Sequence, residues 1–184
     1  MRYNHLLAVG AILPVIVFST GSWSAGTKLD DSTILAIFDQ ANATDIYIGR
    51  LGAKYGYTEE VRKLGEMVTT DHVAVQQMGR DLASKLKITP TPPDNDASVA
   101  NEAKIVAMLQ SKSGRAFDEA YLRHELSFHQ SVIDAIKGTL LPAIDNKAFR
   151  ELVEKVLPGF EHHLAKTKEV AKKLGVSQEK TAQR

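Results

Sequence analysis

The chain has no cysteine, so it can form neither a disulfide framework nor a thiolate metal site. It also has no block of basic residues, and its formal net charge is only +1, which argues against nucleic acid or an anionic lipid surface as the main partner. Hydrophobic residues make up 43% of the 184 positions, enough for one globular domain with a buried core.

Several enzyme signatures are missing as well. The sequence has no Gly-x-Ser-x-Gly nucleophile elbow, no glycine-rich phosphate loop and no His-Glu-x-x-His zinc motif. These absences remove the sequence support for hydrolase or nucleotide-dependent chemistry. The sequence therefore favours a protein that is not an enzyme.

The first 24 residues have the pattern of a secretory signal peptide. Arg2 precedes 13 apolar or small residues, Leu6–Phe18, and Ser24 and Ala25 provide a cleavage site. A bilayer span needs about 20 residues, so we expect cleavage and no integral membrane span afterwards, with a retained N-terminal anchor as the alternative. Cleavage removes Arg2 and no acid, which leaves 22 basic and 22 acidic residues and a formally neutral mature domain.

Beyond this segment the apolar residues recur with a helical period throughout. The spacing predicts four long helices, over about 32–55, 58–86, 114–140 and 146–174. Prolines 90, 92 and 93 exclude helix from 89–96 and predict an extended crossover, followed by a shorter helix over about 97–110. The expected fold class is an all-α, up-down four-helix bundle with an extra short helix before the third long one.

Local signals predict where these helices begin and end. We expect Asp31 or Ser32 to cap the first helix, Thr58 the second, and Asp145 or Asn146 the fourth. Pro142 is expected to close the third helix, and Pro158 is expected to kink or break the fourth. The predicted organisation is a signal peptide over 1–24, a linker over 25–31, the bundle over 32–176 and a disordered tail over 177–184.

Each long helix carries one ionisable residue in the middle of its apolar stripe. These residues are Asp45, His72, His129 and His163. At about 1.5 Å per residue, Asp45 and His72 lie about 20 Å on either side of the first short turn, and His129 and His163 lie about 20 and 27 Å from the second. If both turns lie at the same end of the bundle, the four side chains form one layer.

Buried ionisable groups need partners, and three imidazoles with one carboxylate form a plausible ligand set for one transition metal ion. Without thiolates, the set suits zinc, copper, nickel or iron. Asp71 and Glu125 are predicted to support these ligands from outside. The alternative is a structural or interaction domain in which the same histidines form only a hydrogen-bonded layer. His124 and His162 fall off the stripes and are predicted to face solvent.

Four stretches resemble the exported bacterial family known as domain of unknown function 4142, over about residues 34–174. They are "FDQANATDIYIGRLGAKYG", "VRKLGEMVTTDHVAVQQMGRDLA", "FDEAYLRHELSFHQ" and "VLPGFEHHLAKTKEV". The sharper motifs are the Asp71–His72 pair, a Phe-Asp-x-x-Tyr segment that begins at Phe117, and a Leu-Pro pair followed by His163 and Leu164.

The resemblance implies a ferritin-like bundle in an exported protein of the periplasm or outer membrane, and it implies no reaction. Asp45 stands where the family usually has a glutamate. The Glu-x-x-His units of ferritin-like di-iron proteins are absent here, because Glu125 precedes His129 by four residues and Glu161 precedes His163 by two. This absence argues against an iron oxidase or an iron-storage protein.

Overall fold

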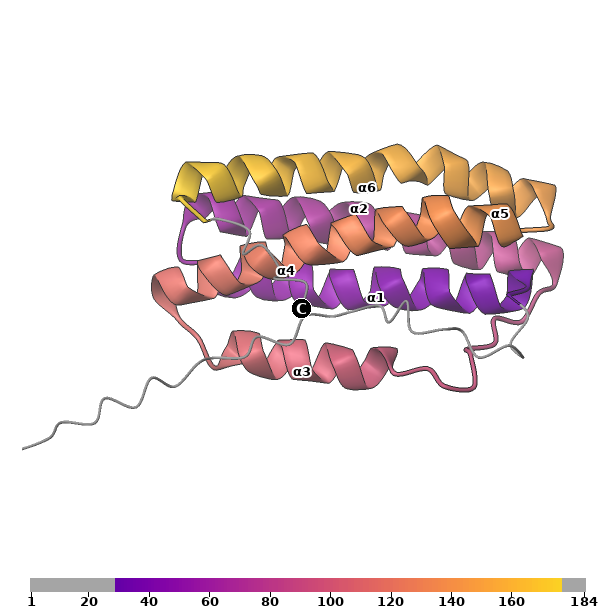
Figure 1. Cartoon of the computed structure of the whole chain (residues 1–184), viewed down its shortest axis with the longest axis horizontal. Coiled ribbons are helices and arrows are strands. Elements are labelled where there is room, and N and C mark those ends of the chain that lie inside the picture. The colour runs from indigo at the N-terminus through magenta and orange to yellow at the C-terminus, as the bar shows by residue number, and fades with distance from the viewer. Residues whose placement is uncertain (1–28, 177–184) are drawn as a thin grey trace, which may run out of the picture.

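The computed structural model of the chain describes residues 29–176, and this part is helical with no strand. Four long helices lie along one axis (Figure 1): α1 (Asp31–Tyr55), α2 (Glu59–Leu86), α4 (Gly114–Ala135) and α6 (Lys147–Leu174). A shorter helix, α3 (Ser98–Gln110), lies beside them, and the π-helical turn η1 (Ile136–Leu140) and α5 (Leu141–Ala143) extend α4. The predicted signal peptide, the tail and most of the linker lie outside the described residues.

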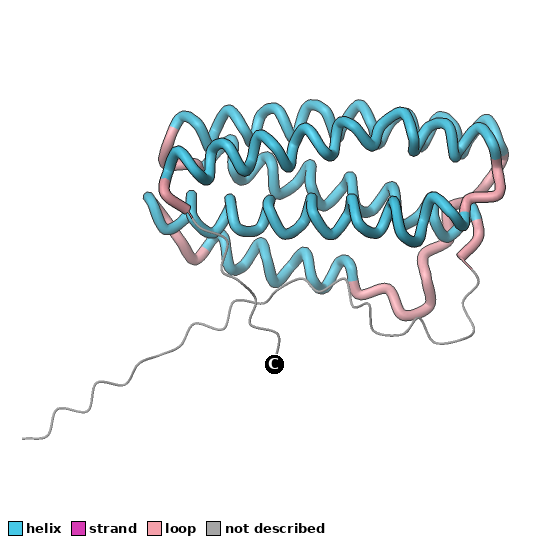
Figure 2. Tube along the Cα trace, turned by 45° about the horizontal axis from the view of Figure 1, so that its top comes forward, coloured by secondary structure: helices cyan, strands magenta, loops and turns pink. Residues whose placement is uncertain are grey.

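The four apolar stripes meet in one core between the long helices. Its fully buried members include Ile48, Val68, Leu122 and Phe149. Figure 2 shows that the loops lie toward the ends of the bundle, whereas the middle of each long helix is uninterrupted. Among the described residues, no helix combines the length and the apolar character that crossing a membrane requires.

The start of α1 differs from the prediction by one residue. Asp30 is the N-cap, because its carboxylate accepts a hydrogen bond from the backbone N–H of Thr33 at 2.9 Å. Asp31 and Ser32 therefore do not cap this helix. Thr58 caps α2 as predicted, and Asn146 caps α6.

Two carboxylates show which helix ends meet. Asp31, at the start of α1, accepts hydrogen bonds from two backbone N–H groups in the turn before α6. Asp118, near the start of α4, accepts hydrogen bonds from two backbone N–H groups in the turn between α1 and α2. Thus α1 and α6 begin at one end of the bundle, and α2 and α4 begin at the other (Figure 1).

This arrangement makes the predicted up-down order wrong. α2 and α4 run in the same direction, because α3 carries the chain back along the bundle between them (Figure 1). The two short turns consequently lie at opposite ends. The local spacing of apolar residues carries no information about this direction, since a helix buries the same stripe whichever way it runs.

Pro142 and Pro158 both lie within helical structure, although the segment that contains Pro142 ends one residue later, at Ala143. α6 continues through Pro158 without a break. The Pro158 ring is exposed, so water can hydrogen bond to the backbone carbonyl that loses its amide partner. Helical structure likewise continues through Pro142 after widening into the π-helical turn η1.

α1 and α2 approach each other closely at a pair of glycines. A Cβ atom added to Gly65 would lie 2.5 Å from the carbonyl oxygen of Gly49 and 2.4 Å from the amide nitrogen of Ala53. No side chain fits in this space. Since Asp45 lies one turn from Gly49 and His72 two turns from Gly65, this contact also positions the middle of α1 against the middle of α2.

Candidate metal centre

The four predicted residues meet near the middle of the bundle. Asp45, His72 and His129 are almost completely buried, and His163 is 3% exposed. Each lies roughly 20–24 Å from the start of its helix. Because a position near the middle of a helix is similarly far from both ends, these residues stay level even though the predicted helix directions are wrong.

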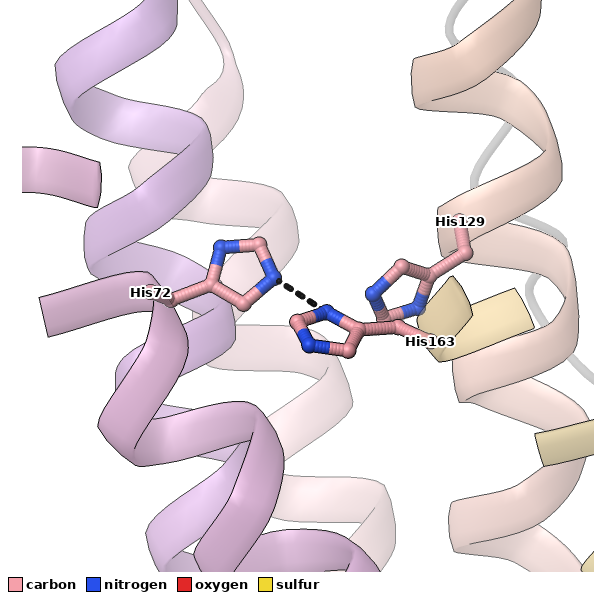
Figure 3. Close-up of side chains that lie close together, drawn as sticks. All are labelled: His72, His129 and His163. Atoms are coloured by element: carbon pink, nitrogen blue, oxygen red, sulfur yellow. Dashed lines mark hydrogen bonds between the residues drawn. The ribbon is translucent and has the colours of Figure 1, made fainter. Parts of the chain in front are cut away.

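The inner ring nitrogens of the three histidines converge (Figure 3). One nitrogen from each of His72, His129 and His163 lies within 4.8 Å of the other two. His72 Nε2 is 3.2 Å from His163 Nδ1 and 2.8 Å from Asp45 Oδ2. His129 Nε2 is 3.4 Å from the same Asp45 oxygen.

Asn42 determines which nitrogen of His72 carries the proton. The amide nitrogen of Asn42 donates to the carbonyl of Phe38 at 2.7 Å, so its Oδ1 faces His72 and accepts a hydrogen bond from Nδ1–H at 2.8 Å. Neutral His72 therefore directs the lone pair of Nε2 into the cluster. Sequence reasoning missed Asn42, whose only signal is a polar residue three positions before Asp45.

The other two histidines follow the same rule. His163 Nε2 donates a hydrogen bond to Asp71 Oδ2 at 2.9 Å, so Asp71 contacts this histidine from outside the cluster. His129 Nδ1 donates to the backbone carbonyl of Glu125 at 3.1 Å. In all three rings the outer nitrogen has an acceptor, so a neutral ring can carry its proton there and keep a lone pair on the inner nitrogen, as metal-binding histidines do. One further proton would satisfy the 3.2 Å contact between His72 Nε2 and His163 Nδ1.

The centre of the cluster lacks positive charge. Asp45 Oδ1 and His129 Nε2 have no hydrogen-bond partner, and Asp45 Oδ2 has only the ring nitrogens of His72 and His129 beside it. The buried residues of the described range 29–176 include no lysine and no arginine. Unpartnered buried polar atoms cost free energy, so this arrangement is suited to a bound cation.

The pKa shifts of Asp45, His129 and His163 favour the protonation states in which these side chains can bind a metal ion. Burial raises the pKa of Asp45, but His72 and His129 outweigh it and lower the pKa to about 2. Burial lowers the pKa of His129 to about 4. It also lowers the pKa of His163, against the hydrogen bond to Asp71. At neutral pH Asp45 is therefore a carboxylate, and His129 and His163 are neutral.

The sequence predicts Glu125 to support the metal ligands from outside, but its side chain lies in the core beside them. It is fully buried, neither carboxylate oxygen has a hydrogen-bond partner, and Oε2 lies 3.4 Å from His129 Nδ1. One ligand atom from each of Asp45, Glu125 and His129 lies within 4.8 Å of the others. The nearby Tyr121 is also fully buried, and its hydroxyl has no partner.

The prediction for His124 is wrong. His124 is buried and packs on Phe128, with ring centroids 5.7 Å apart. The single apolar stripe assigned to this segment is too narrow, because α4 packs against α1, α3 and α6 and so buries more than one face. His162 is exposed, as predicted.

Two buried histidines are expected to make the metal-free protein less stable in acid, whereas Glu125, whose pKa burial raises well above its usual value, acts in the opposite direction. Burial lowers the pKa of both His124 and His129 from 6.5 to about 4. Between pH 6.5 and about pH 4 each of these two rings is protonated more readily in the unfolded chain, so its contribution to the free energy of unfolding falls as the pH falls. The expected loss is about 2 kcal/mol for each residue at about pH 5. Urea unfolding in chelator, at pH 7.5 and pH 5, measures it.

Two variants serve as controls for this acid effect. His162→Ala should leave the pH dependence unchanged, since this ring is exposed. His124→Leu should make the change in the free energy of unfolding from pH 7.5 to pH 5 more favourable by about 2 kcal/mol than in the wild-type protein, because it removes one of the two buried imidazoles with a strongly lowered pKa and leaves Glu125 in place. The same pH dependence in His124→Leu and in the wild-type protein would contradict the prediction.

Comparison with known proteins identifies a family. The model of the family described as "Domain of unknown function (DUF4142)" matches residues 19–170. No curated protein and no solved structure gives a match.

Proposed function

The chain belongs to the DUF4142 family, and we propose that it binds a transition metal ion through Asp45, His72, His129 and His163. One observation carries this proposal. Every outer ring nitrogen donates a hydrogen bond to a fixed acceptor, while the inner nitrogens converge beside a buried carboxylate. Neutral imidazoles held in this way are ready to bind a metal without rearranging.

The ligand set indicates which ions fit. Three imidazoles and one carboxylate suit zinc, copper, nickel or ferrous iron. Four protein ligands satisfy a tetrahedral ion and leave no open position for a substrate, which favours binding and buffering of the metal over catalysis. Asp71 would hold His163 in place from the surface side.

The compartment and the fold type belong to the same proposal. The single long crossover through α3 supports the proposal that the bundle is ferritin-like. We propose that residues 1–24 direct export to the periplasm or outer membrane, that 25–31 link to a bundle over 32–176, and that 177–184 form a tail. Cell fractionation with N-terminal sequencing tests the export step.

The competing function is that of a structural or interaction domain without a metal. A second proton on His72 would let Nε2 donate toward Asp45 Oδ2 or His163 Nδ1, which lie 2.8 and 3.2 Å away. The cluster would then be a hydrogen-bonded layer that aligns the helices.

Metal-dependent melting distinguishes the two functions. An ion present at 100 times its Kd stabilises the folded state by about 2.7 kcal/mol, which raises the Tm of a chain this size by roughly 5–10 °C. The measurement compares chelator-treated protein with and without zinc, copper, nickel, iron or manganese, and EDTA should reverse the shift. An unchanged Tm with every ion would favour the structural domain.

A further inference from the structure

Glu125 has no role in the three-histidine site, although it is buried beside it. His129 donates its outer proton to the backbone carbonyl of Glu125, so the Glu125 carboxylate is not needed to orient this ring. Both carboxylate oxygens are buried without a hydrogen-bond partner. Burial and the neighbouring Asp45 raise the pKa of Glu125 well above its usual range, so without a cation this group is a neutral acid in the core.

Asp45 connects Glu125 to the three-histidine site. Its Oδ2 lies beside the inner nitrogens of His72 and His129, and its Oδ1 is buried without a partner. Asp45 and Glu125 belong, with His129, to a second group of close ligand atoms. The hydroxyl of Tyr121 is buried and unpartnered on the same side of α4, one helical turn before Glu125.

Charge supports the same conclusion. Asp45 is ionised, whereas Glu125 can become a carboxylate only when a cation compensates its charge, and the buried residues of the described chain include no lysine or arginine to do so. Since an inner imidazole nitrogen can bind only one ion, His129 cannot serve two positions through Nε2. The Asp45 carboxylate can, because each of its two oxygens can bind a different ion.

We propose that the core contains a second cation position beside the first, formed by the carboxylates of Asp45 and Glu125 with the Tyr121 hydroxyl alongside. Asp45 then bridges the two positions. This inference rests on the proposed function, because both positions share Asp45. The first position is rich in nitrogen, whereas the second is rich in oxygen and suits a harder divalent ion such as manganese or ferrous iron.

Stoichiometry with Co²⁺ alone tests the second position. Protein dialysed against excess Co²⁺ and then analysed for metal should contain two ions per chain. Glu125→Gln keeps the size of the side chain but cannot become a carboxylate, and it should contain one. Co²⁺ in four-coordinate surroundings absorbs visible light strongly, so this variant should keep the visible band of the first position. That band also shows that the variant is folded.

Two further variants complete the experiment. Tyr121→Phe removes only the hydroxyl and should weaken binding of the second ion while the visible band stays. Glu119→Gln changes an exposed acid on the same helix and should retain two ions.

The remaining outcomes distinguish failure of the second position from failure of the proposed function. Wild-type protein with one ion per chain and an intact band would overturn the second position and leave the proposed function standing. Wild-type protein with no ion and no band would overturn both. Two ions in Glu125→Gln, or loss of the band in that variant, would overturn the assignment of Glu125 to a separate position.

Discussion

His129→Ala is expected to abolish metal binding at ion concentrations that saturate the wild-type protein, with Kd rising more than about 100-fold. His129 presents a free Nε2 lone pair to the cluster and lies 3.4 Å from Asp45 Oδ2. Loss of a residue that only orients a metal ligand typically lowers metal affinity by about 10–100-fold, so loss of the ligand itself should lower the affinity further. Competition with a chelator of known affinity measures the change.

His162→Ala is the matched control for this prediction. His162 is exposed, although it directly precedes the ligand His163 in sequence and the two ring centroids lie 6.3 Å apart. Its removal should leave Kd unchanged. Asp71→Asn should give an intermediate loss, roughly 10–100-fold, because Asp71 only orients His163. Equal losses for His129→Ala and His162→Ala would show that surface histidines bind the ion.

Gly65→Ala is expected to destabilise the fold by about 3 kcal/mol or more. The added Cβ would lie 2.4–2.5 Å from backbone atoms of α1, and backbone cannot move aside as a flexible side chain can. α1 and α2 must therefore separate. This movement would also shift Asp45 relative to His72, so metal affinity should fall together with stability.

Gly159→Ala is the control within another helix. Nothing lies within 4 Å of a Cβ atom at Gly159, so alanine there should stabilise the protein by about 0.5–1 kcal/mol through its better helix propensity. Urea unfolding of both variants measures the two free energies. If Gly65→Ala were as stable as the wild-type protein, the close approach of α1 and α2 would not be a requirement of the fold.

Much of the candidate site could be predicted because its signals are local. Helical spacing of apolar residues depends on neighbours three or four positions apart, and this spacing alone predicts that Asp45 and His72 are buried polar residues. The same reasoning placed His124 in solvent, because it assumed one buried stripe on a helix that packs on several sides. A one-dimensional pattern cannot show how many neighbours a helix has.

The sequence by itself determined the all-helical fold, the cap at Thr58 and the four mid-helix residues, since each follows from residues near one another in the chain. Only the tertiary structure decided that α2 and α4 run in the same direction and that Asn42 fixes the tautomer of His72. It also decided that Glu125 points into the core. These features depend on contacts between residues far apart in sequence, and a local period records nothing of such contacts.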